Sequence, residues 1–381
     1  MKQIRLLAAL CLISLGSLQA QKKEVETLIV GTYTPATELN NPETKSAYIV
    51  LFDAENGSLQ LIDSLHAGYN ASFIAADRKK KHFYAVNELG GKEPKGKIKA
   101  FNYSMPWTQA KEMGECSTLG NDPCHVSLSR KHNIVTAANY SSGNLVSIKT
   151  DKGGALECIH TVNNQHVGRG GSEKQTAPRA HQVVEAPFGQ YLYACDLGTD
   201  AIYVYKMNLR PFAVEPIHTI KTEPGAGPRH MLFHPNKKYA YVVNELNGTV
   251  ECFLVNKKSG QLNRFQTIAT TPDSLKSQAG SADIHITSDG KYLYTSNRGP
   301  FNEIVCFEVN PKTGELKING HYPSGGLGPR NFRISNNNQY MLVANQRSNN
   351  IVVYGIDPTN GALTPTGEKL ELHAPVCITE L

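Results

Sequence analysis

The chain has 381 residues, including 39 Lys or Arg and 33 Asp or Glu, and its formal net charge is +6. With 40% hydrophobic residues this length can bury a large core, which excludes a disordered chain. The basic residues do not gather into a stripe, so we expect no nucleic-acid partner. The composition therefore predicts a globular protein whose functional basic residues act singly, inside a site.

Residues 1–20 have the pattern of an export signal. Lys2 and Arg5 are followed by the uncharged stretch from Leu6 to Leu18 and then by the small residue Ala20. This stretch is too short to cross a bilayer as a helix. We therefore expect a signal peptide over 1–20, a mature domain over 21–381, a periplasmic or secreted location, and no membrane contact after cleavage.

The cysteines of the mature chain are widely spaced and contain no C-x-x-C pair. Their spacing predicts neither a disulfide framework nor a zinc site. We expect most of them to be buried apolar side chains. They are Cys116, Cys124, Cys158, Cys195, Cys252, Cys306 and Cys377.

Short apolar strands that end in a polar amide or acid recur along the chain at intervals of about 50 residues. The closing residues are Asn87, Asn139, Asp196, Asn244, Asn297 and Asn345. A short apolar run precedes each strand, another follows it, and in most repeats a Gly-x-Leu turn then leads into an outer strand. Four strands in every ~50 residues are typical of a propeller blade. The sequence therefore predicts an all-β fold, a seven-bladed β-propeller with four antiparallel strands per blade.

The two ends of the chain indicate how the ring closes. LIVGTY (28–33) matches the amide-ended second strand of a blade, but no first strand precedes it. APVCITEL (374–381) matches a first strand with nothing after it. We therefore expect the C-terminal strand to become the inner strand of the blade that the N-terminus begins.

The repeat register also predicts where a site lies. In an antiparallel blade the start of the inner strand and the end of the second strand lie side by side, at one rim of the channel. The inner-strand position is occupied by Ser72, Cys124, His181, Arg229, Ala282, Arg330 and Val376. The position after the amide is occupied by Glu88, Tyr140, Leu197, Glu245, Arg298 and Gln346.

Positions that serve the fold stay alike from blade to blade, whereas positions that serve a ligand differ in chemistry. This criterion selects His181, Arg229, Glu245, Arg298 and Arg330. Three guanidinium groups, an imidazole and a carboxylate at one channel mouth suit an anionic substrate and proton transfer.

Simpler interpretations remain open for several of these residues. The amide column can cap the turns of its own blade, and Arg229 with Glu245 can form a purely structural ion pair. The histidines on inner strands, among them His125, His230 and His285, can equally be structural. His230 and His234 would be ~13 Å apart on a strand, so they cannot chelate one metal, and we expect no metal or cofactor.

Three segments carry a resemblance to a known family: GPRHMLFHPNKKYAYVVNELNGTV (227–250), ADIHITSDGKYLYTSNR (282–298) and GPRNFRISNNNQYMLVANQ (328–346). They resemble the seven-bladed propeller lactonases, which include the propeller-type 6-phosphogluconolactonase and the fungal carboxymuconate cyclase. The resemblance implies catalytic and anion-binding roles for four residues: His181, Arg229, Glu245 and Arg298. As further substrate-binding candidates we add Arg330, His230, His285, Glu88 and Gln346.

Two features depart from the family pattern. KQTAPRAH (174–181) has Lys174 and Arg179 where many relatives have Arg and His. The export signal is the second departure, because 6-phosphogluconolactone is made in the cytoplasm.

The sequence thus predicts hydrolysis of a sugar-type lactone without a metal. Arg229 and Arg298 would bind the anionic group, and His181 or Glu245 would activate water. We favour His181 as the base, because a Glu245 beside guanidinium groups should have a low pKa and would act as orienter or water-positioning group. Two alternatives remain: a carboxymuconate-type cycloisomerase, and a non-enzymatic propeller that binds a sugar acid or a partner protein. We expect a monomer whose ligand is a small anionic lactone or sugar acid.

Overall fold

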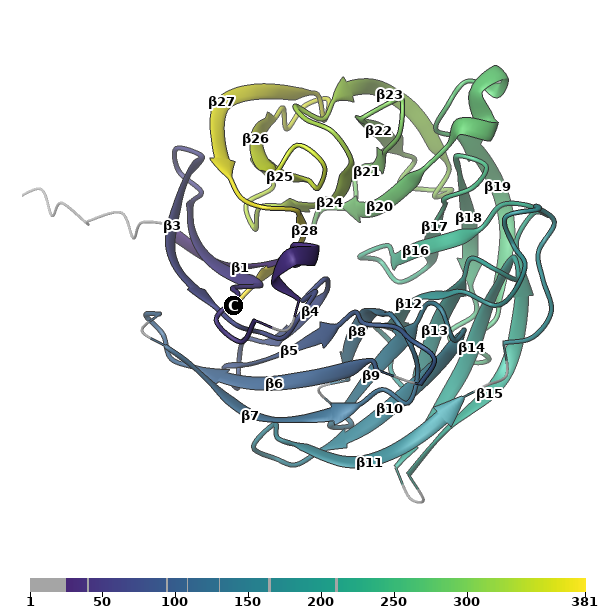
Figure 1. The fold of residues 1–381 in the computed structure, drawn as a ribbon. Helices are drawn as coiled ribbons and strands as arrows, with labels where there is room; N and C mark the ends of the chain where they lie inside the picture. Colours follow the sequence, from purple (N-terminus) through teal and green to yellow (C-terminus); the bar gives the residue numbers. More distant parts are fainter. Residues whose placement is uncertain are drawn as a thin grey trace, which may run out of the picture.

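Seven four-stranded antiparallel sheets form a ring in the computed structural model (Figure 1). The model describes residues 25–381 except 40, 94, 108, 130, 164–165 and 210–211. The predicted signal peptide therefore lies outside the described residues. The prediction of a seven-bladed propeller with four antiparallel strands per blade is confirmed.

The blades follow one another along the chain, and we number them from the N-terminus. From the inner to the outer strand, blades 1 to 4 are β28 (Pro375–Glu380), β1 (Val25–Thr32), β2 (Ala47–Asp53) and β3 (Ser58–Leu65); β4 (Ile74–Asp77), β5 (His82–Asn87), β6 (Lys97–Tyr103) and β7 (Ala110–Ser117); β8 (Pro123–Ser129), β9 (Ile134–Asn139), β10 (Asn144–Thr150) and β11 (Leu156–Asn163); and β12 (Ala180–Glu185), β13 (Tyr191–Asp196), β14 (Ala201–Leu209) and β15 (Phe212–Lys221). Blades 5 to 7 are β16 (Pro228–Phe233), β17 (Tyr239–Asn244), β18 (Thr249–Val255) and β19 (Leu262–Ala269); β20 (Ser281–Ile286), β21 (Tyr292–Asn297), β22 (Glu303–Val309) and β23 (Leu316–Pro323); and β24 (Pro329–Ile334), β25 (Tyr340–Asn345), β26 (Asn350–Ile356) and β27 (Leu363–Glu371).

The ring closes as predicted, by the C-terminal strand. β28 pairs antiparallel with β1, and Val30 lies opposite Ile378. Across the junction with blade 7, Arg333 donates to Glu26 Oε2 at 3.0 Å and to Glu380 Oε2 at 2.7 Å. One guanidinium therefore ties together the first described strand, the last strand and the neighbouring blade.

The core is divided among the junctions between blades. Seven buried apolar clusters each combine residues of two adjacent blades. The cluster between blades 4 and 5, for example, joins Tyr193 and Ile202 to Val242 and Phe253. This arrangement explains why the second strands are almost entirely apolar: they pack against a neighbouring blade on both faces.

A repeated hydrogen bond crosses four of the blade junctions. A tyrosine of the second strand donates its hydroxyl to the glycine carbonyl of a Gly-x-Leu turn in the next blade. The pairs are Tyr84–Gly154 (2.7 Å), Tyr193–Gly260 (2.7 Å), Tyr241–Gly314 (2.8 Å) and Tyr294–Gly361 (2.8 Å). These glycines have φ between 71° and 90°, a conformation that other residues rarely adopt.

The amide column serves the fold, as predicted, but its partners differ from the prediction in several blades. The Nδ2 groups of Asn139, Asn297 and Asn345 donate to carbonyls of the linkers that enter their blades, at 2.9, 3.1 and 2.9 Å. The amides therefore fix the approach to the inner strand, in addition to the turns of their own blades.

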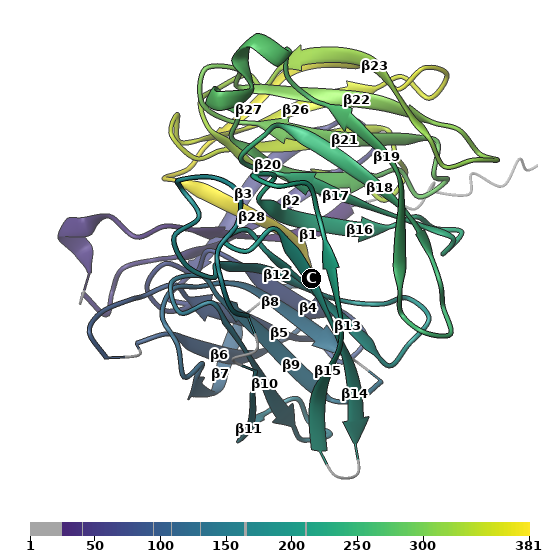
Figure 2. The same ribbon diagram turned by 90° about the vertical axis from the view of Figure 1, so that its right-hand side faces the viewer.

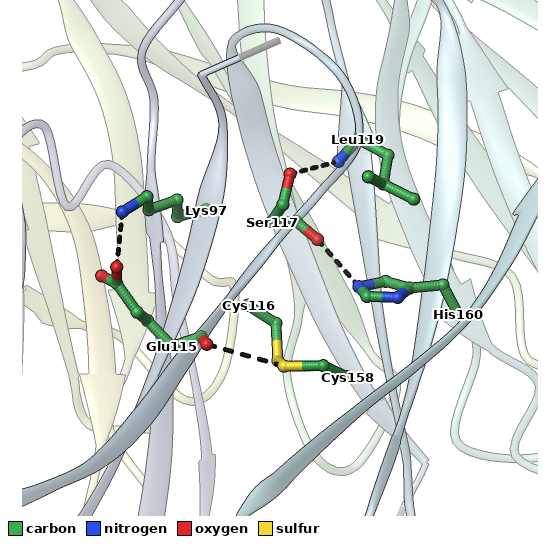
Figure 3. The surroundings of a disulfide bond; sticks show 7 residues. All are labelled: Lys97, Glu115, Cys116, Ser117, Leu119, Cys158 and His160. Atoms are coloured by element: carbon green, nitrogen blue, oxygen red, sulfur yellow. Dashed lines mark hydrogen bonds and ion pairs between the residues drawn. A yellow bond between two sulfur atoms is a disulfide. The ribbon is translucent and has the colours of Figure 1, made fainter.

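One cysteine prediction is wrong: Cys116 and Cys158 form a disulfide, between β7 of blade 2 and β11 of blade 3 (Figure 3). Beside it, His160 Nε2 lies 3.1 Å from the carbonyl oxygen of Ser117. No spacing motif in the sequence indicates this pair, because the two cysteines lie 42 residues apart on the outermost strands of different blades. The other five cysteines of the described chain are buried, as expected.

Two 3-10 helices lie in connections between strands: η1 (Ala36–Glu38) between β1 and β2, and η2 (Asp273–Gln278) between β19 and β20. Both project from the same side of the ring, on the left in Figure 2. Within the described ranges no helix is long and apolar enough to cross a membrane.

Candidate active site

The predicted inner-strand positions surround one small chamber in the channel. The free volume of this chamber is about 10 Å³. Its lining is Ser72, Phe73, Cys124, His181, Arg229, His230, Arg330, Asn331 and Val376. The chamber thus includes six of the seven positions that the register predicted, and the seventh, Ala282, contributes its carbonyl oxygen to Arg229 at 2.5 Å.

A wider cavity of about 240 Å³ shares three of these residues. It is lined by Tyr33, Glu88, Cys124, Tyr140, His181, Glu245, Arg298 and Arg330. Apart from the shared residues, its lining consists of side chains that follow the ends of second strands. We call this space the mouth cavity.

A larger hollow of about 440 Å³ lies between blades 6 and 7. Its two charged side chains, Asp289 and Lys291, pair with each other at 3.4 Å. The mouth cavity combines two carboxylates, two guanidinium groups and an imidazole. The charged and titratable lining therefore favours the mouth cavity, although it is smaller, as the candidate active site.

Glu245 is shared between two arginines. Its Oε2 accepts a hydrogen bond from Arg229 Nε at 2.8 Å and lies 2.8 Å from Arg298 Nη2. Burial alone would raise the pKa of Glu245, but Arg298, Arg229 and Arg330 outweigh it and hold that pKa below its ordinary value. The low pKa expected for Glu245 is confirmed. Among the described residues no hydrogen bond joins Glu245 to His181, so an orienting contact between them is not present.

Arg229 is enclosed by protein partners. It is 1% exposed, and its Nη1 contacts the Ala282 carbonyl as well as His230 Nε2 at 3.3 Å. Burial, Arg298 and Arg330 lower its pKa to about 10, so it stays cationic at neutral pH. Arg298 is likewise held from two sides, since its Nε donates to Gly280 O at 3.0 Å.

Arg330 has no such partners. Its guanidinium makes no hydrogen bond or ion pair with any residue in the described part of the chain, and its Cζ lies 5.4 Å from the ring centroid of Tyr33. Burial would lower the pKa of Arg330, but Tyr33, Glu88 and Glu245 raise it above the ordinary value. A permanent cation with free donors therefore borders both the chamber and the mouth cavity.

His181 is held in its neutral form. The residue is 4% exposed, and its Nδ1 is buried without a hydrogen-bond partner among the described residues. Its ring lies 5.6 Å from Tyr140 and 5.2 Å from His230 by centroid distance. Burial, followed by the charge of Arg229, lowers the pKa of His181 well below its ordinary value. At neutral pH the imidazole can therefore accept a proton.

Glu88 is the second carboxyl group of the mouth cavity. Its Oε1 accepts the hydroxyl of Tyr33 at 2.8 Å, and its Oε2 accepts the hydroxyl of Ser72. Two hydrogen bonds with Asn70 fix its backbone, at 3.1 Å and 2.9 Å. Burial raises the pKa of Glu88, and Arg330, Ser72 and Tyr33 only partly oppose this effect.

The structure brings together some of the predicted substrate-binding residues and leaves others apart. Arg330 and Glu88 line the mouth cavity, and His230 lines the chamber. His285 and Gln346 border neither space. His285 instead shares the buried carboxylate of Asp283 with His230, at 3.0 Å and 2.9 Å.

Sequence reasoning missed Tyr33 and Asp283. Tyr33 follows the strand of blade 1 that matches the amide-ended pattern, so the same register could have found it. Asp283 carried no signal, because its partners come from three blades: His230, its neighbour His285, and Asn331, which donates to Asp283 Oδ2 at 2.6 Å.

The two residues that depart from the family pattern, Lys174 and Arg179, lie outside the mouth cavity. Arg179 lies at the rim, where its Cζ is 5.5 Å from the ring centroid of Tyr140 and its Nη1 donates to Ser141 O at 3.0 Å. Lys174 is exposed. Neither residue lines the mouth cavity, so neither departure changes its lining.

Fold and site together define a class of enzyme. Residues 27–380 match the family described as lactonase, 7-bladed β-propeller, and the chain belongs to this family. The predicted family is confirmed, and with it the hydrolysis of a lactone as the reaction class.

Individual relatives cover nearly the whole chain. It is 33% identical over 354 residues to the 6-phosphogluconolactonase of Formosa agariphila, which covers 91% of this chain and 97% of the relative. It is 30% identical over 355 residues to the 6-phosphogluconolactonase of Bacillus subtilis, covering 92% and 96%. The structure of the periplasmic gluconolactonase of Pseudomonas aeruginosa is similar, with a TM-score of 0.84, 27% identity, and coverage of 94% and 99%.

Proposed function

We propose that this chain hydrolyses a gluconolactone-type sugar lactone in the mouth cavity, using its own side chains. The observation that carries the proposal is a neutral imidazole, His181, that borders the same cavity as the unpaired cation Arg330 and the arginine-bound Glu245. The relatives named 6-phosphogluconolactonase or gluconolactonase support the same substrate class.

Arg330 anchors the polar end of the substrate. Its donors have no hydrogen-bond or ion-pair partner among the described residues, so binding a phosphate, carboxylate or hydroxyl oxygen breaks no ion pair seen there. Arg229 and Arg298 remain bound to Glu245 and offset the negative charge that develops on the acyl oxygen. This division of roles differs from the sequence hypothesis, in which Arg229 and Arg298 bind the anionic group.

His181 removes a proton from the attacking water. Because its pKa is lowered, it is unprotonated at neutral pH, and an imidazolium forms only while negative charge develops nearby on the lactone. Glu245 is already engaged by both arginines, which stabilise its ionised form and lower its pKa. Its role is to keep Arg229 and Arg298 in place.

The site of action is outside the cytoplasm. Three observations support export: the signal pattern of residues 1–20, the Cys116–Cys158 disulfide, which is typical of an oxidising compartment, and the periplasmic location named for the Pseudomonas relative. Mass spectrometry of the protein from its native host should find an N-terminus near Gln21. An intact Met1 on cytoplasmic protein would contradict export.

A pH-stat assay of the mature protein tests the activity directly. The substrates are δ-gluconolactone, its 6-phosphate and muconolactone, each with a correction for spontaneous hydrolysis. Acid release from a gluconolactone at a rate that depends on His181 supports the proposal. Turnover of muconolactone alone would favour a cycloisomerase, and binding of gluconate without turnover of any lactone would favour a non-enzymatic propeller.

A further inference from the structure

Lactone hydrolysis requires two proton transfers at different atoms. The attacking water loses a proton, and the ring oxygen gains one when its bond to the acyl carbon breaks. His181 can accept the first proton, whereas the second needs a donor, because an alkoxide is a poor leaving group. A site that serves both steps needs an acid as well as a base.

The mouth cavity contains a carboxyl group that is independent of the arginine pair. Glu88 follows the second strand of blade 2, and Glu245 follows the second strand of blade 5. Blades 2 and 5 are three positions apart in a ring of seven, so the two carboxyl groups enter the cavity from opposite sides. His181, on blade 4, borders the same space.

Hydrogen bonds hold both the side chain and the backbone of Glu88 in place. Both carboxyl oxygens meet hydroxyl groups, those of Tyr33 and Ser72, and Asn70 binds its backbone on both sides. Hydroxyl groups can donate or accept, so this cage accommodates the carboxylate as well as the carboxylic acid. Glu88 can therefore gain and lose a proton without losing its partners.

We propose that Glu88 is the general acid that protonates the ring oxygen as the lactone opens, an assignment that rests on the proposed hydrolysis.

The proton balance of the reaction closes with these two residues. Water adds its oxygen to the acyl carbon, and His181 takes the released proton. The bond between the acyl carbon and the ring oxygen then breaks, and the ring oxygen receives the proton of Glu88. The product hydroxy acid leaves as a carboxylate, and the proton on His181 returns through solvent to Glu88, while the proton of the new acid is released.

The electrostatic surroundings support this assignment. Burial raises the pKa of Glu88, whereas the arginines lower that of Glu245, and two carboxyl groups with opposite shifts are suited to different roles. The charged and titratable groups around Glu88 include Arg330, Tyr33, Cys124 and Asp122, and Asp122 raises its pKa further.

The test compares two substrates of the same shape, the gluconolactone that the wild type hydrolyses and its analogue with sulfur in place of the ring oxygen. A thiol has a pKa of about 8.5, so the thiolate leaves without help from an acid. Glu88→Gln should slow hydrolysis of the oxygen lactone by about 100-fold or more and that of the thiolactone by only a few-fold. The alkaline fall in kcat/KM for the oxygen lactone should also disappear in this variant.

Glu308→Gln is the matched control, because Glu308 is an exposed residue of β22, outside the site, and this variant should hydrolyse both substrates at the wild-type rate. If Glu88→Gln does not fold, Tyr33→Phe provides a second variant, with a smaller loss that is again confined to the oxygen lactone. Equal losses on both substrates, or no loss on either, would overturn the role of Glu88 while leaving the proposed function intact. A wild type that hydrolyses no lactone would instead refute the proposed function itself.

Discussion

Arg229 and Arg330 occupy the same register position in different blades, but their surroundings differ. Each is the second residue of its inner strand, in β16 and β24, and both line the chamber. Arg229 contacts Glu245, His230 and a backbone carbonyl, whereas Arg330 has no hydrogen-bond or ion-pair partner among the described residues and lies over the ring of Tyr33. The register therefore gives the location of a side chain, and its partners determine its role.

The first prediction separates the two arginines by stability and has the largest expected effect. Arg229→Ala should lower the free energy of unfolding by about 3–5 kcal/mol, because it breaks a buried ion pair. Arg330→Ala should lower it by less than Arg229→Ala does, since no hydrogen bond or ion pair is lost. Urea denaturation of both variants measures the difference. Equal losses would show that Arg330 also has a structural role.

The second prediction concerns the proposed base, His181, which lines the chamber together with both arginines. His181→Ala should lower kcat by about 10²-fold or more, equivalent to roughly 2.7 kcal/mol, with little change in KM. Steady-state kinetics on the gluconolactone that is turned over provide the measurement. A change in KM alone would make His181 a binding residue.

The third prediction tests Arg330 as the anchor. Arg330→Ala should raise KM by about 10- to 100-fold with a smaller effect on kcat, because a hydrogen bond to a charged group is worth about 1.5–3 kcal/mol. Arg330→Lys should restore only part of the affinity, since a point charge cannot form a bidentate contact. A wild-type KM in Arg330→Ala would contradict the anchoring role.

The fourth prediction has the smallest expected effect for each residue and pH unit. It follows from the neutral histidines near the arginines. Burial lowers the pKa values of His125, His181 and His230, that of His230 to about 4. Below about pH 6.5 the unfolded chain binds protons that the folded chain does not. The free energy of unfolding should therefore fall by about 1.4 kcal/mol per pH unit for each histidine as the pH drops from 6 towards 4.

Denaturation curves at several pH values measure this slope. His230→Asn should reduce it by the contribution of one proton. His321→Asn is the control, because hydrogen bonding to Glu303 raises the pKa of His321, so its loss should not reduce the slope. A wild-type slope in His230→Asn would show that His230 does not stay neutral in the folded chain.

The fold and the location of the site could be predicted because both depend on regular strand pairing. Once the amide-ended strands are aligned, antiparallel pairing fixes which residues meet at the rim, such as Arg229 and Glu245 in blade 5. Contacts between blades could not be predicted this way. Arg298 reaches Glu245 from blade 6, and Asp283 binds His230 of blade 5, because side-chain reach rather than register decides these pairs.

The disulfide illustrates the same limit on the outside of the ring. Cys116 and Cys158 face each other only because β7 and β11 are the outermost strands of adjacent blades. The repeat pattern fixes pairing within a blade and does not say which residues of neighbouring outer strands meet. Sequence spacing alone therefore gave no reason to pair them.

The tyrosine-to-glycine hydrogen bonds make blades 5 and 6 each complementary to a copy of itself. A blade such as blade 5 accepts a bond at Gly260 on one face and donates one from Tyr241 on the other. This is a head-to-tail interface within one chain, and such interfaces extend until rotation closes them into a ring. A duplicate of blade 5 or blade 6 would therefore find a matching face on each side without any new contact. The number of blades is then limited by the closing strand β28, which must still reach β1.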